Sequence, residues 1–160
     1  MPNYKGDDRR EAHYTTEELY NHMYDNILQK YHHEPITEFL ETSAGDGRLI
    51  DFLQKKGYKT RAYDIFKHEE RDDIIIGDYL KEKLEYKKGR VCFQNPPFNK
   101  GLKFVYKALE ECDYCVSILA INSFLNIDYD KYEVDTIDIF RNYDFGTCKV
   151  SVCIVGIKKK

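Results

Sequence analysis

The chain has 160 residues and a formal net charge of −3, with 33% charged and 42% hydrophobic residues. This length and composition predict one globular domain with a hydrophobic core of its own. The negative charge argues against a strong, unspecific grip on nucleic acid, although a local basic rim stays compatible with it. The apolar runs are only a few residues long, so we expect neither a membrane span nor a secretory signal.

The cysteines predict a reducing environment. There are five of them, an odd number, and they lie mostly in apolar, strand-like runs. We interpret them as reduced, buried thiols and expect a cytoplasmic protein. Cys112 and Cys115 form a lone CxxC pair without the second ligand pair that zinc requires, so we expect ordinary packing there and no metal site.

The first predicted element is a helix. Residues 1–13 are polar and charged, and we expect a flexible segment there, followed by a single domain over residues 14–160. A helix is predicted over residues 16–31, where apolar side chains recur every four positions. Thr15 and Glu18 have the spacing of a capping box at its start.

Strands then alternate with helices or turns along the rest of the chain. Strands are predicted at residues 36–40, 60–65, 73–77, 91–94, 114–120, 136–140 and 147–157, and helices at 48–56 and 100–111. This alternation predicts an α/β fold in which a seven-stranded, mostly parallel sheet carries helices on both faces. The last two strands have no helix between them, so they are expected to form a C-terminal antiparallel hairpin.

The first candidate site is the stretch ETSAGDG, which runs from Glu41 to Gly47 between a strand and a helix. Its glycines let the backbone approach a ligand closely, and the following helix N-terminus adds positive potential. Asp64 ends the next strand, 17 residues after Gly47, where a carboxylate can accept both hydroxyls of a ribose. Asp78 ends the third strand. All of these residues are expected at the carboxyl edge of the sheet, where ligands bind.

The same stretch argues against a ligand with phosphates. The full GxGxxG fingerprint requires a glycine at position 50, which is Ile50 here, and no Walker lysine follows Gly47. A cationic nucleoside such as S-adenosylmethionine, which has a ribose and an adenine but no phosphate, fits the acids better than a dinucleotide. A plain turn is the alternative, because a GxG alone is a weak signal.

The second candidate site is QNPPFNK, residues 94–100, where two adjacent prolines end a strand abruptly. The side-chain oxygen of Asn95 and the carbonyl of Pro96 could accept hydrogen bonds from an aromatic amine, and the Pro-Pro pair holds that carbonyl rigid. Phe98 offers a face on which an extruded base can stack. The alternative is a strand terminator with Phe98 in the core.

The glycine turn, both acids and the NPPF run, in this order, resemble the class I S-adenosylmethionine-dependent methyltransferases. More narrowly, they resemble the amino-methyltransferases with an (N/D)PP(F/Y) motif, chiefly those that act on adenine N6. The resemblance extends from about Tyr14 to the C-terminus. It implies a Rossmann-like methyltransferase domain and an enzyme that methylates the N6 amino group of adenine in nucleic acid, with DNA slightly favoured over RNA.

The resemblance also implies roles for individual residues. Glu41 and the glycine backbone would hold the methionine portion of S-adenosylmethionine, Asp64 the ribose, and Asp78 the adenine amino group. The full set of cofactor-binding residues implied in this way is Tyr14, Thr15, Glu41, Ser43, Gly45, Gly47, Asp64, Ile65, Asp78, Tyr79 and Asn95. The catalytic residues would be Asn95, Pro96, Pro97 and Phe98. The family usually has Thr-Pro where this chain has Thr15-Thr16, so Thr15 is either a cofactor contact or a helix cap.

Phe98, Lys100 and Phe145 are the predicted substrate-binding residues. Phe145 or Tyr143, in the turn of the final hairpin, could sandwich an extruded adenine with Phe98, and a turn aromatic packed on the core is an equal alternative. Lys100 and Lys103 follow the motif and could meet a phosphate backbone, although a solvated helix face explains Lys103 equally well. By contrast, Lys87, Lys88 and Arg90 precede the strand and are expected at the opposite edge of the sheet.

Sequence-specific DNA adenine methyltransferases carry a separate target-recognition region, and we expect none here, since only 16 residues separate Asp78 from Asn95. Three hypotheses stay open: a DNA methyltransferase of low specificity, an RNA adenine methyltransferase, or a subunit whose protein partner supplies specificity. Methylation of a protein glutamine is a further alternative, which Phe98 disfavours because such motifs usually end in tyrosine. A non-catalytic cofactor-binding subunit is the last one.

Overall fold

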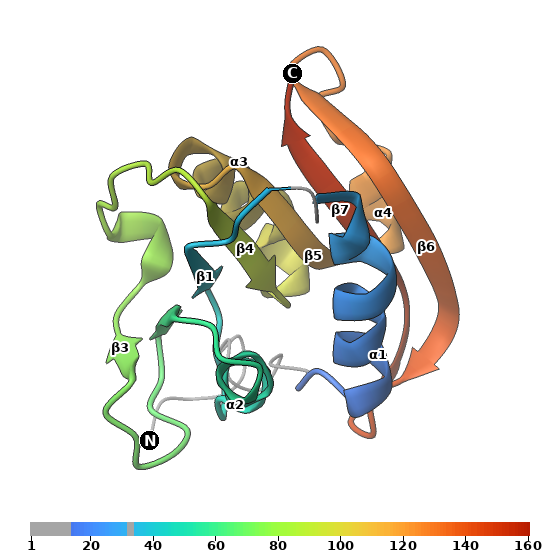
Figure 1. Ribbon diagram of the computed structural model, residues 1–160. Helices are drawn as coiled ribbons and strands as arrows, with labels where there is room; N and C mark the ends of the chain where they lie inside the picture. The colour runs from blue at the N-terminus through green and yellow to red at the C-terminus, as the bar shows by residue number, and fades with distance from the viewer. Residues whose placement is uncertain (1–13, 32–33) are drawn as a thin grey trace.

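The computed structural model describes residues 14–31 and 34–160, so the flexible segment expected at 1–13 lies outside the described residues. Figure 1 follows the elements, which are α1 (Glu17–His22), η1 (Met23–Ile27), η2 (Leu28–Tyr31), β1 (Glu38–Glu41), α2 (Arg48–Lys55), β2 (Thr60–Asp64), β3 (Ile74–Ile76), η3 (Tyr79–Lys81), β4 (Arg90–Gln94), η4 (Phe98–Lys100), α3 (Gly101–Glu111), β5 (Tyr114–Ala120), α4 (Ile121–Phe124), β6 (Tyr132–Asp144) and β7 (Lys149–Lys159). Of the short segments, η1 is a π-helix and the others are 3-10 turns.

The strands form one seven-stranded sheet in the order β3-β2-β1-β4-β5-β7-β6. The first five strands in this order are parallel, whereas β7 runs antiparallel to both β5 and β6. The predicted α/β fold, with a mostly parallel sheet and a terminal antiparallel hairpin, is therefore confirmed. The strand order reverses between β1 and β4, and this switch point is where an open α/β sheet forms a ligand crevice.

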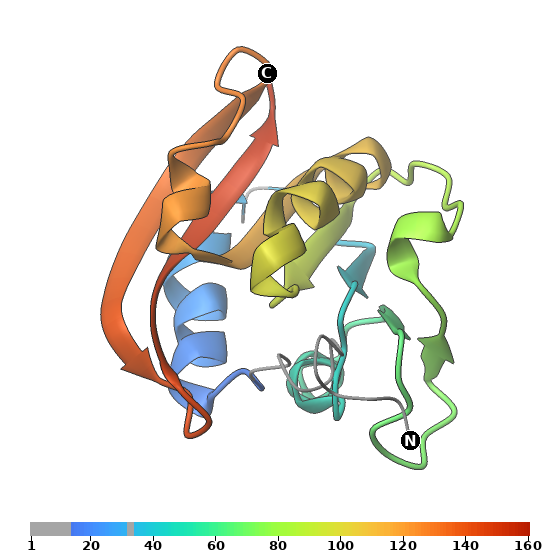
Figure 2. The ribbon, with the colours of Figure 1, turned by 180° about the vertical axis from the view of Figure 1, so that it is seen from behind.

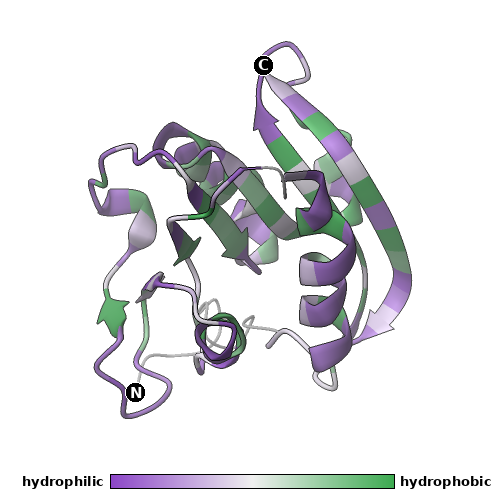
Figure 3. Cartoon of the chain, in the orientation of Figure 1, coloured by the Kyte–Doolittle hydropathy of each residue, from purple (hydrophilic) through white to green (hydrophobic). Residues whose placement is uncertain are grey.

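Helices cover both faces of the sheet, as predicted. On one face, apolar side chains of α1 and α2 pack against β1, β4, β5 and β7, and α1 lies in front of the sheet in Figure 1. On the other face α3 packs with η3 and α4, and Figure 2 shows α3 from that side. The central strands β4 and β5 are mostly hydrophobic in Figure 3, because they are buried on both faces.

The first helix differs from the prediction at its start. The N-cap is Thr16, whose hydroxyl accepts a hydrogen bond from the Leu19 N–H at 3.3 Å, so the expected capping role of Thr15 is wrong. Thr15 is buried instead. The helical path then continues to Tyr31, as expected, but changes from α to π to 3-10 geometry on the way.

The last hairpin is longer than predicted. β6 spans 13 residues, and its pairing with β7 shifts register between Val134 and Thr136 and again between Phe140 and Tyr143. Each shift interrupts the alternation of apolar and polar side chains on which a strand prediction relies. None of the helices in the described ranges is long and apolar enough to cross a membrane.

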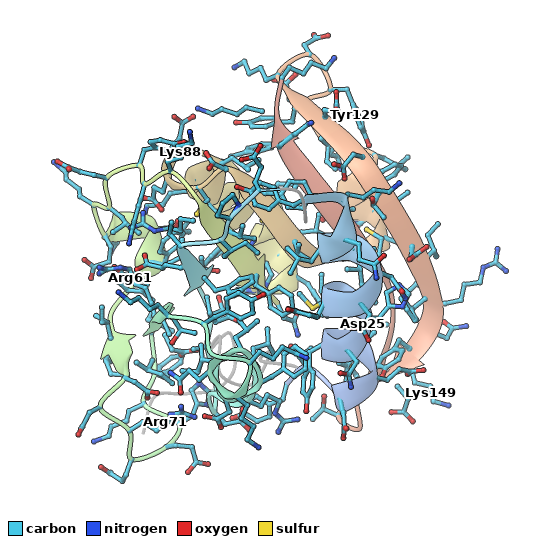
Figure 4. All side chains as sticks on the ribbon, viewed as in Figure 1. Asp25, Arg61, Arg71, Lys88, Tyr129 and Lys149 are labelled. Carbon is cyan, nitrogen blue, oxygen red and sulfur yellow. The ribbon has the colours of Figure 1, made fainter. Side chains whose placement is uncertain are left out.

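The basic residues before β4 lie at the end of the sheet opposite the carboxyl edge. Arg90 is 4% exposed and is the register partner of Glu38 on β1. Its Nε donates to Glu38 Oε1 at 2.7 Å, and its Nη1 donates to the carbonyls of Glu85 and Glu111. Arg90 is therefore a buried structural cation, whereas Lys88 is exposed at this edge (Figure 4).

We predict that Arg90→Met lowers the free energy of unfolding by about 3–5 kcal/mol, because it leaves the Glu38 carboxylate buried without its main partner. Adding Glu38→Gln to this variant should restore part of the loss, since the uncompensated charge is then gone. Urea unfolding of the three proteins measures both effects. A loss below about 1 kcal/mol for Arg90→Met, as for an exposed ion pair, would contradict the prediction.

Candidate active site

A cavity opens at the carboxyl edge of the parallel strands and encloses about 830 Å³, counting the space at its mouth. The described residues that line it include most of the predicted site, namely Tyr14, Thr15, Glu41, Ser43, Gly45, Asp64, Ile65, Asp78, Tyr79, Asn95, Pro96, Pro97, Phe98 and Lys100. Gly47 and Phe145 are not among the described lining residues. The structure thus brings the two candidate stretches, which are far apart in sequence, to one cavity.

The glycine turn is held by the end of the neighbouring strand. Asp64 lies at the end of β2, and its Oδ2 accepts a hydrogen bond from the Gly45 N–H at 2.7 Å. Gly45 and Gly47 have φ values of +58° and +90°, which glycine adopts without strain. A Cβ at Gly47 would also overlap the guanidinium of Arg71, so that side chain would have to shift. Asp64 therefore shapes the glycine turn.

Arg71 is a residue that the sequence analysis missed. Its guanidinium donates to the Asp46 carbonyl at 3.2 Å and forms ion pairs with Asp51 and Asp73, both at 2.8 Å. It thereby links the glycine turn to α2 and to the residue that precedes β3. Hydrogen bonding to Arg71 lowers the pKa of Asp73 to about 2. An arginine in an irregular loop gives no sequence pattern from which this link could be predicted.

His68 was also missed, and it connects Asp64 to Tyr14. The His68 Nε2 lies 3.2 Å from Asp64 Oδ1, and its Nδ1 lies 2.7 Å from the Tyr14 hydroxyl. With Tyr14 as donor, these contacts assign the imidazole proton to Nε2. The ring of Tyr14 lies beside Gly45, where an added Cβ would be 3.0 Å from its Cε1. Tyr14 consequently covers part of the glycine turn.

Glu41 is the most unusual charged group of the cavity. It is 1% exposed, and its Oε1 accepts a hydrogen bond from the Ser43 N–H at 2.9 Å. Burial, with a further contribution from Asp64, raises the pKa of Glu41 to about 8, although the Ser43 hydrogen bond acts in the opposite direction. None of the described groups that shift this pKa is a cation. A cationic ligand would favour the charged form of Glu41.

A row of buried polar side chains positions the NPPF stretch. Gln94, the last residue of β4, is fully buried and bonds to Thr42 after β1 and to Ser117 on β5. The next residue, Asn95, donates from Nδ2 to the Thr15 hydroxyl at 3.1 Å. Since the amide group is planar, this bond directs the Asn95 carbonyl oxygen away from Thr15. The buried hydroxyl of Thr15 therefore anchors the Asn95 amide at the cavity.

The predicted aromatic residues lie next to one another. The rings of Phe98 and Phe145 are in edge contact, with centroids 6.0 Å apart, and Tyr143 contacts Phe145 at 5.0 Å. The Tyr143 hydroxyl is bonded to Thr16 at the start of α1. In this arrangement a base cannot lie between Phe98 and Phe145. A base that stacks on Phe98 must use the rest of its surface, or the two rings must separate.

The remaining predicted residues take structural positions at the cavity wall. Asp78 caps η3, with its Oδ1 accepting from the Leu80 N–H at 3.0 Å. Tyr79 is 2% exposed and donates its hydroxyl hydrogen to Glu111, and burial raises its pKa well above the ordinary value. Ile65 is 44% exposed at the cavity.

In the described ranges no group of three or more His, Cys, Asp or Glu side chains could hold a metal ion.

Solved structures resemble this chain, whereas no family profile and no curated protein sequence matches it. A Pyrococcus horikoshii protein, provisionally described as an RNA methyltransferase, superimposes with a TM-score of 0.68 at 13% identity over 91% of this chain and 86% of its own. The 23S rRNA methyltransferase ErmE gives 0.61 at 13% identity over 91% and 69%. A SAM-dependent O-methyltransferase of Thermotoga maritima gives 0.63 at 11% over 91% and 66%.

The fold is that of the Rossmann-like methyltransferases. At these identities the likeness extends to the fold alone. The three neighbours are described with different acceptors, RNA in two cases and an oxygen atom in the third, so the acceptor has to be inferred from the residues of this chain.

We predict that Glu41→Gln stabilises the ligand-free protein at pH 8 but not at pH 5. The pKa of Glu41 is about 8 in the folded protein, above its value of about 4.3 in the unfolded chain. The folded protein is therefore most stable below about pH 4.3, where the carboxyl is neutral in both states, and it loses stability as the pH rises towards 8. Each pKa unit corresponds to about 1.4 kcal/mol, so the gain at pH 8 should be a few kcal/mol. Denaturation at a series of pH values measures it. If the free energy of unfolding depended on pH in the same way in the two proteins, the raised pKa of Glu41 would be contradicted.

Proposed function

We propose that this protein is an S-adenosylmethionine-dependent methyltransferase that acts on the N6 amino group of adenine in nucleic acid. The observation that carries the proposal is the position of Asn95, Pro96 and Phe98 at one cavity with the acids of the glycine turn. The fold, which this chain shares with methyltransferases, supports methyl transfer but does not bear on the acceptor.

The residues of the cavity fit S-adenosylmethionine. Glu41 and Asp64 are both buried carboxylates, which suits a ligand with an ammonium and a sulfonium and disfavours one with phosphates. Asp64 would accept hydrogen bonds from the ribose hydroxyls, while Ile65 and Asp78 would contact the adenine. When bound, this cofactor supplies an electrophilic methyl group. The chain's own part is to hold it and to direct the acceptor amine towards it.

The role proposed for Asn95 follows from the chemistry of an aromatic amine. Its lone pair is delocalised into the ring, so it is a weak nucleophile. The carbonyl oxygens of Asn95 and Pro96 accept hydrogen bonds from the NH₂ group and stabilise the positive charge that develops on nitrogen. Two consecutive prolines keep the Pro96 carbonyl in place, so little reorganisation is needed. Thr15 acts as a positioning residue, because its buried hydroxyl bonds to the Asn95 amide and holds it beside the amine.

DNA and RNA are both candidate substrates, and the test must include each of them. Purified protein is incubated with methyl-tritiated cofactor and with single-stranded DNA, duplex DNA, RNA or a protein mixture. Labelled nucleic acid is digested to nucleosides and analysed by mass spectrometry. We expect N6-methyladenine as the labelled product. Label in protein, or in a ribose oxygen, would refute the proposed acceptor, and cofactor binding without transfer to any of them would favour a non-catalytic subunit.

We predict that Asn95→Ala lowers kcat by at least about 100-fold, the effect of removing one preorganised hydrogen-bonding group from a transition state. The dissociation constant of the cofactor, measured by calorimetry, should change little, because the proposed partner of Asn95 is the acceptor amine. Asn26→Ala is a matched control, since Asn26 is an exposed asparagine on the first helix. Substantial activity in Asn95→Ala would refute the mechanism.

Thr15→Val and Thr15→Ser separate the two roles of Thr15. We predict that Thr15→Val, which keeps the shape but removes the hydroxyl, lowers kcat by about tenfold, in line with the loss of one buried hydrogen bond. Thr15→Ser retains the hydroxyl and should keep most of the activity. Steady-state kinetics and calorimetry with the cofactor measure both. If Thr15→Val weakens cofactor binding and leaves kcat unchanged, Thr15 is a cofactor contact and not a positioning residue.

A further inference from the structure

A second cavity adjoins the candidate active site. It encloses about 640 Å³, again counting the space at its mouth, and it lies between the start of α3 and the short helix α4. Its described lining residues are Phe98, Asn99, Lys100, Gly101, Leu102, Lys103, Asn122, Ser123 and Asn126. Phe98 and Lys100 line both cavities, so the second continues the first along the edge of the sheet.

The lining of this second cavity is rich in hydrogen-bond donors. Two ammonium groups, three carboxamides and one hydroxyl contribute to it, and none of its described lining residues is acidic. The chain as a whole has 28 acidic and 25 basic residues, whereas the described lining of this cavity has two lysines and no acid. Lysine, asparagine and serine side chains are the groups that commonly contact phosphate and sugar oxygens.

The start of α3 adds to this potential. The helix has 11 residues, its N-cap Lys100 makes no side-chain capping bond, and its first turn holds no acidic residue. The positive end of its dipole is therefore not offset locally. Gly101 allows this turn to pack directly on β5, because a Cβ there would lie 2.7 Å from Leu119 Cδ2. The close packing brings the helix start to the cavity wall.

The opposite wall of the cavity is formed by α4 and by the turn that follows it. The Asn126 N–H bonds to the Ser123 carbonyl at 3.0 Å, and the Asn126 side chain bonds to the Asn122 carbonyl at 3.1 Å. These bonds close the turn that follows α4 and hold this wall in place. If the start of α3 only faced solvent, no wall of amide side chains would be needed opposite it.

We propose that this second cavity binds the phosphodiester and sugar next to the target adenine, with Lys103 and Asn122 contacting the phosphate. The proposal rests on the function proposed above. A nucleotide whose base lies at Phe98 has its own backbone where the two cavities meet. Contacts to phosphate and sugar there hold the nucleic acid in a way that does not depend on its base sequence.

The test measures binding of a fluorescent single-stranded oligonucleotide by anisotropy, so it does not depend on methyl transfer. Lys103→Ala and Asn122→Ala should each weaken binding by about tenfold, the effect of losing one strong phosphate contact. For Lys103→Ala, the slope of log K against log salt should fall by about 0.7 in magnitude. Lys88→Ala is the matched control, because Lys88 is exposed at the opposite edge of the sheet and should change neither value.

A second arm locates the contact. Each linkage of the oligonucleotide is replaced in turn by an uncharged methylphosphonate. Wild-type protein should lose affinity at a linkage next to the target adenine, and Lys103→Ala should lose less at that linkage, because only the Asn122 contact is left to lose. Wild-type affinity in both cavity variants, or an equal penalty in wild type and Lys103→Ala, would overturn the proposal. Dependence of acidic-peptide binding on Lys103, with oligonucleotide binding unaffected, would also overturn it.

The experiments distinguish a failure of the proposed function from a failure of this inference. If the wild-type protein binds oligonucleotide through the second cavity but labels no adenine, the catalytic assignment is wrong and the binding assignment stands. If it labels adenine while both cavity variants bind as wild type does, the catalytic assignment stands and the second cavity has no such role.

Discussion

The site depends on the buried side chain of Gln94. A buried amide without partners costs about 1–3 kcal/mol, so Gln94 has to be satisfied within the sheet. It accepts a hydrogen bond from Thr42 and donates one to Ser117 at 3.2 Å, which joins the ends of three neighbouring chain segments at one level. Glu41 precedes Thr42 and Asn95 follows Gln94, so the same row of bonds holds one residue of each candidate stretch at the cavity. The distance between the two stretches is thus fixed by the sheet.

Around this row, the side chains of the site hold one another in place at an electrostatic cost. The Asp64 carboxylate already accepts hydrogen bonds from the Gly45 and Phe66 N–H groups and lies beside His68. Glu41 is buried with its pKa raised to about 8. If the residues at positions 41 and 64 served stability alone, neutral side chains would be expected there. Such local conflicts are typical of functional sites, and a cationic ligand would relieve this one.

The sequence predicts the centre of this molecule better than its periphery. β4 is apolar at its centre and β5 is apolar apart from Ser117, so both strands were predicted, and the parallel topology placed the carboxyl-edge motifs together. The bulges of β6 break the alternation that a strand prediction uses. His68 and Arg71 lie in the irregular segment between β2 and β3, where their partners are set only by tertiary contacts. Thr16 rather than Thr15 caps α1, and the Thr15 hydroxyl bonds to Asn95, a residue 80 positions away.

The central claim is that one cavity holds the cofactor and presents Asn95 to its reactive end. A crystal structure with S-adenosylhomocysteine, the product of methyl transfer, tests it most directly. The account predicts the ribose hydroxyls on Asp64, the adenine beside Ile65 and Asp78, and the sulfur facing Asn95 and Pro96. A ligand bound outside this cavity, or one inside it with the sulfur directed away from Asn95, would contradict the account.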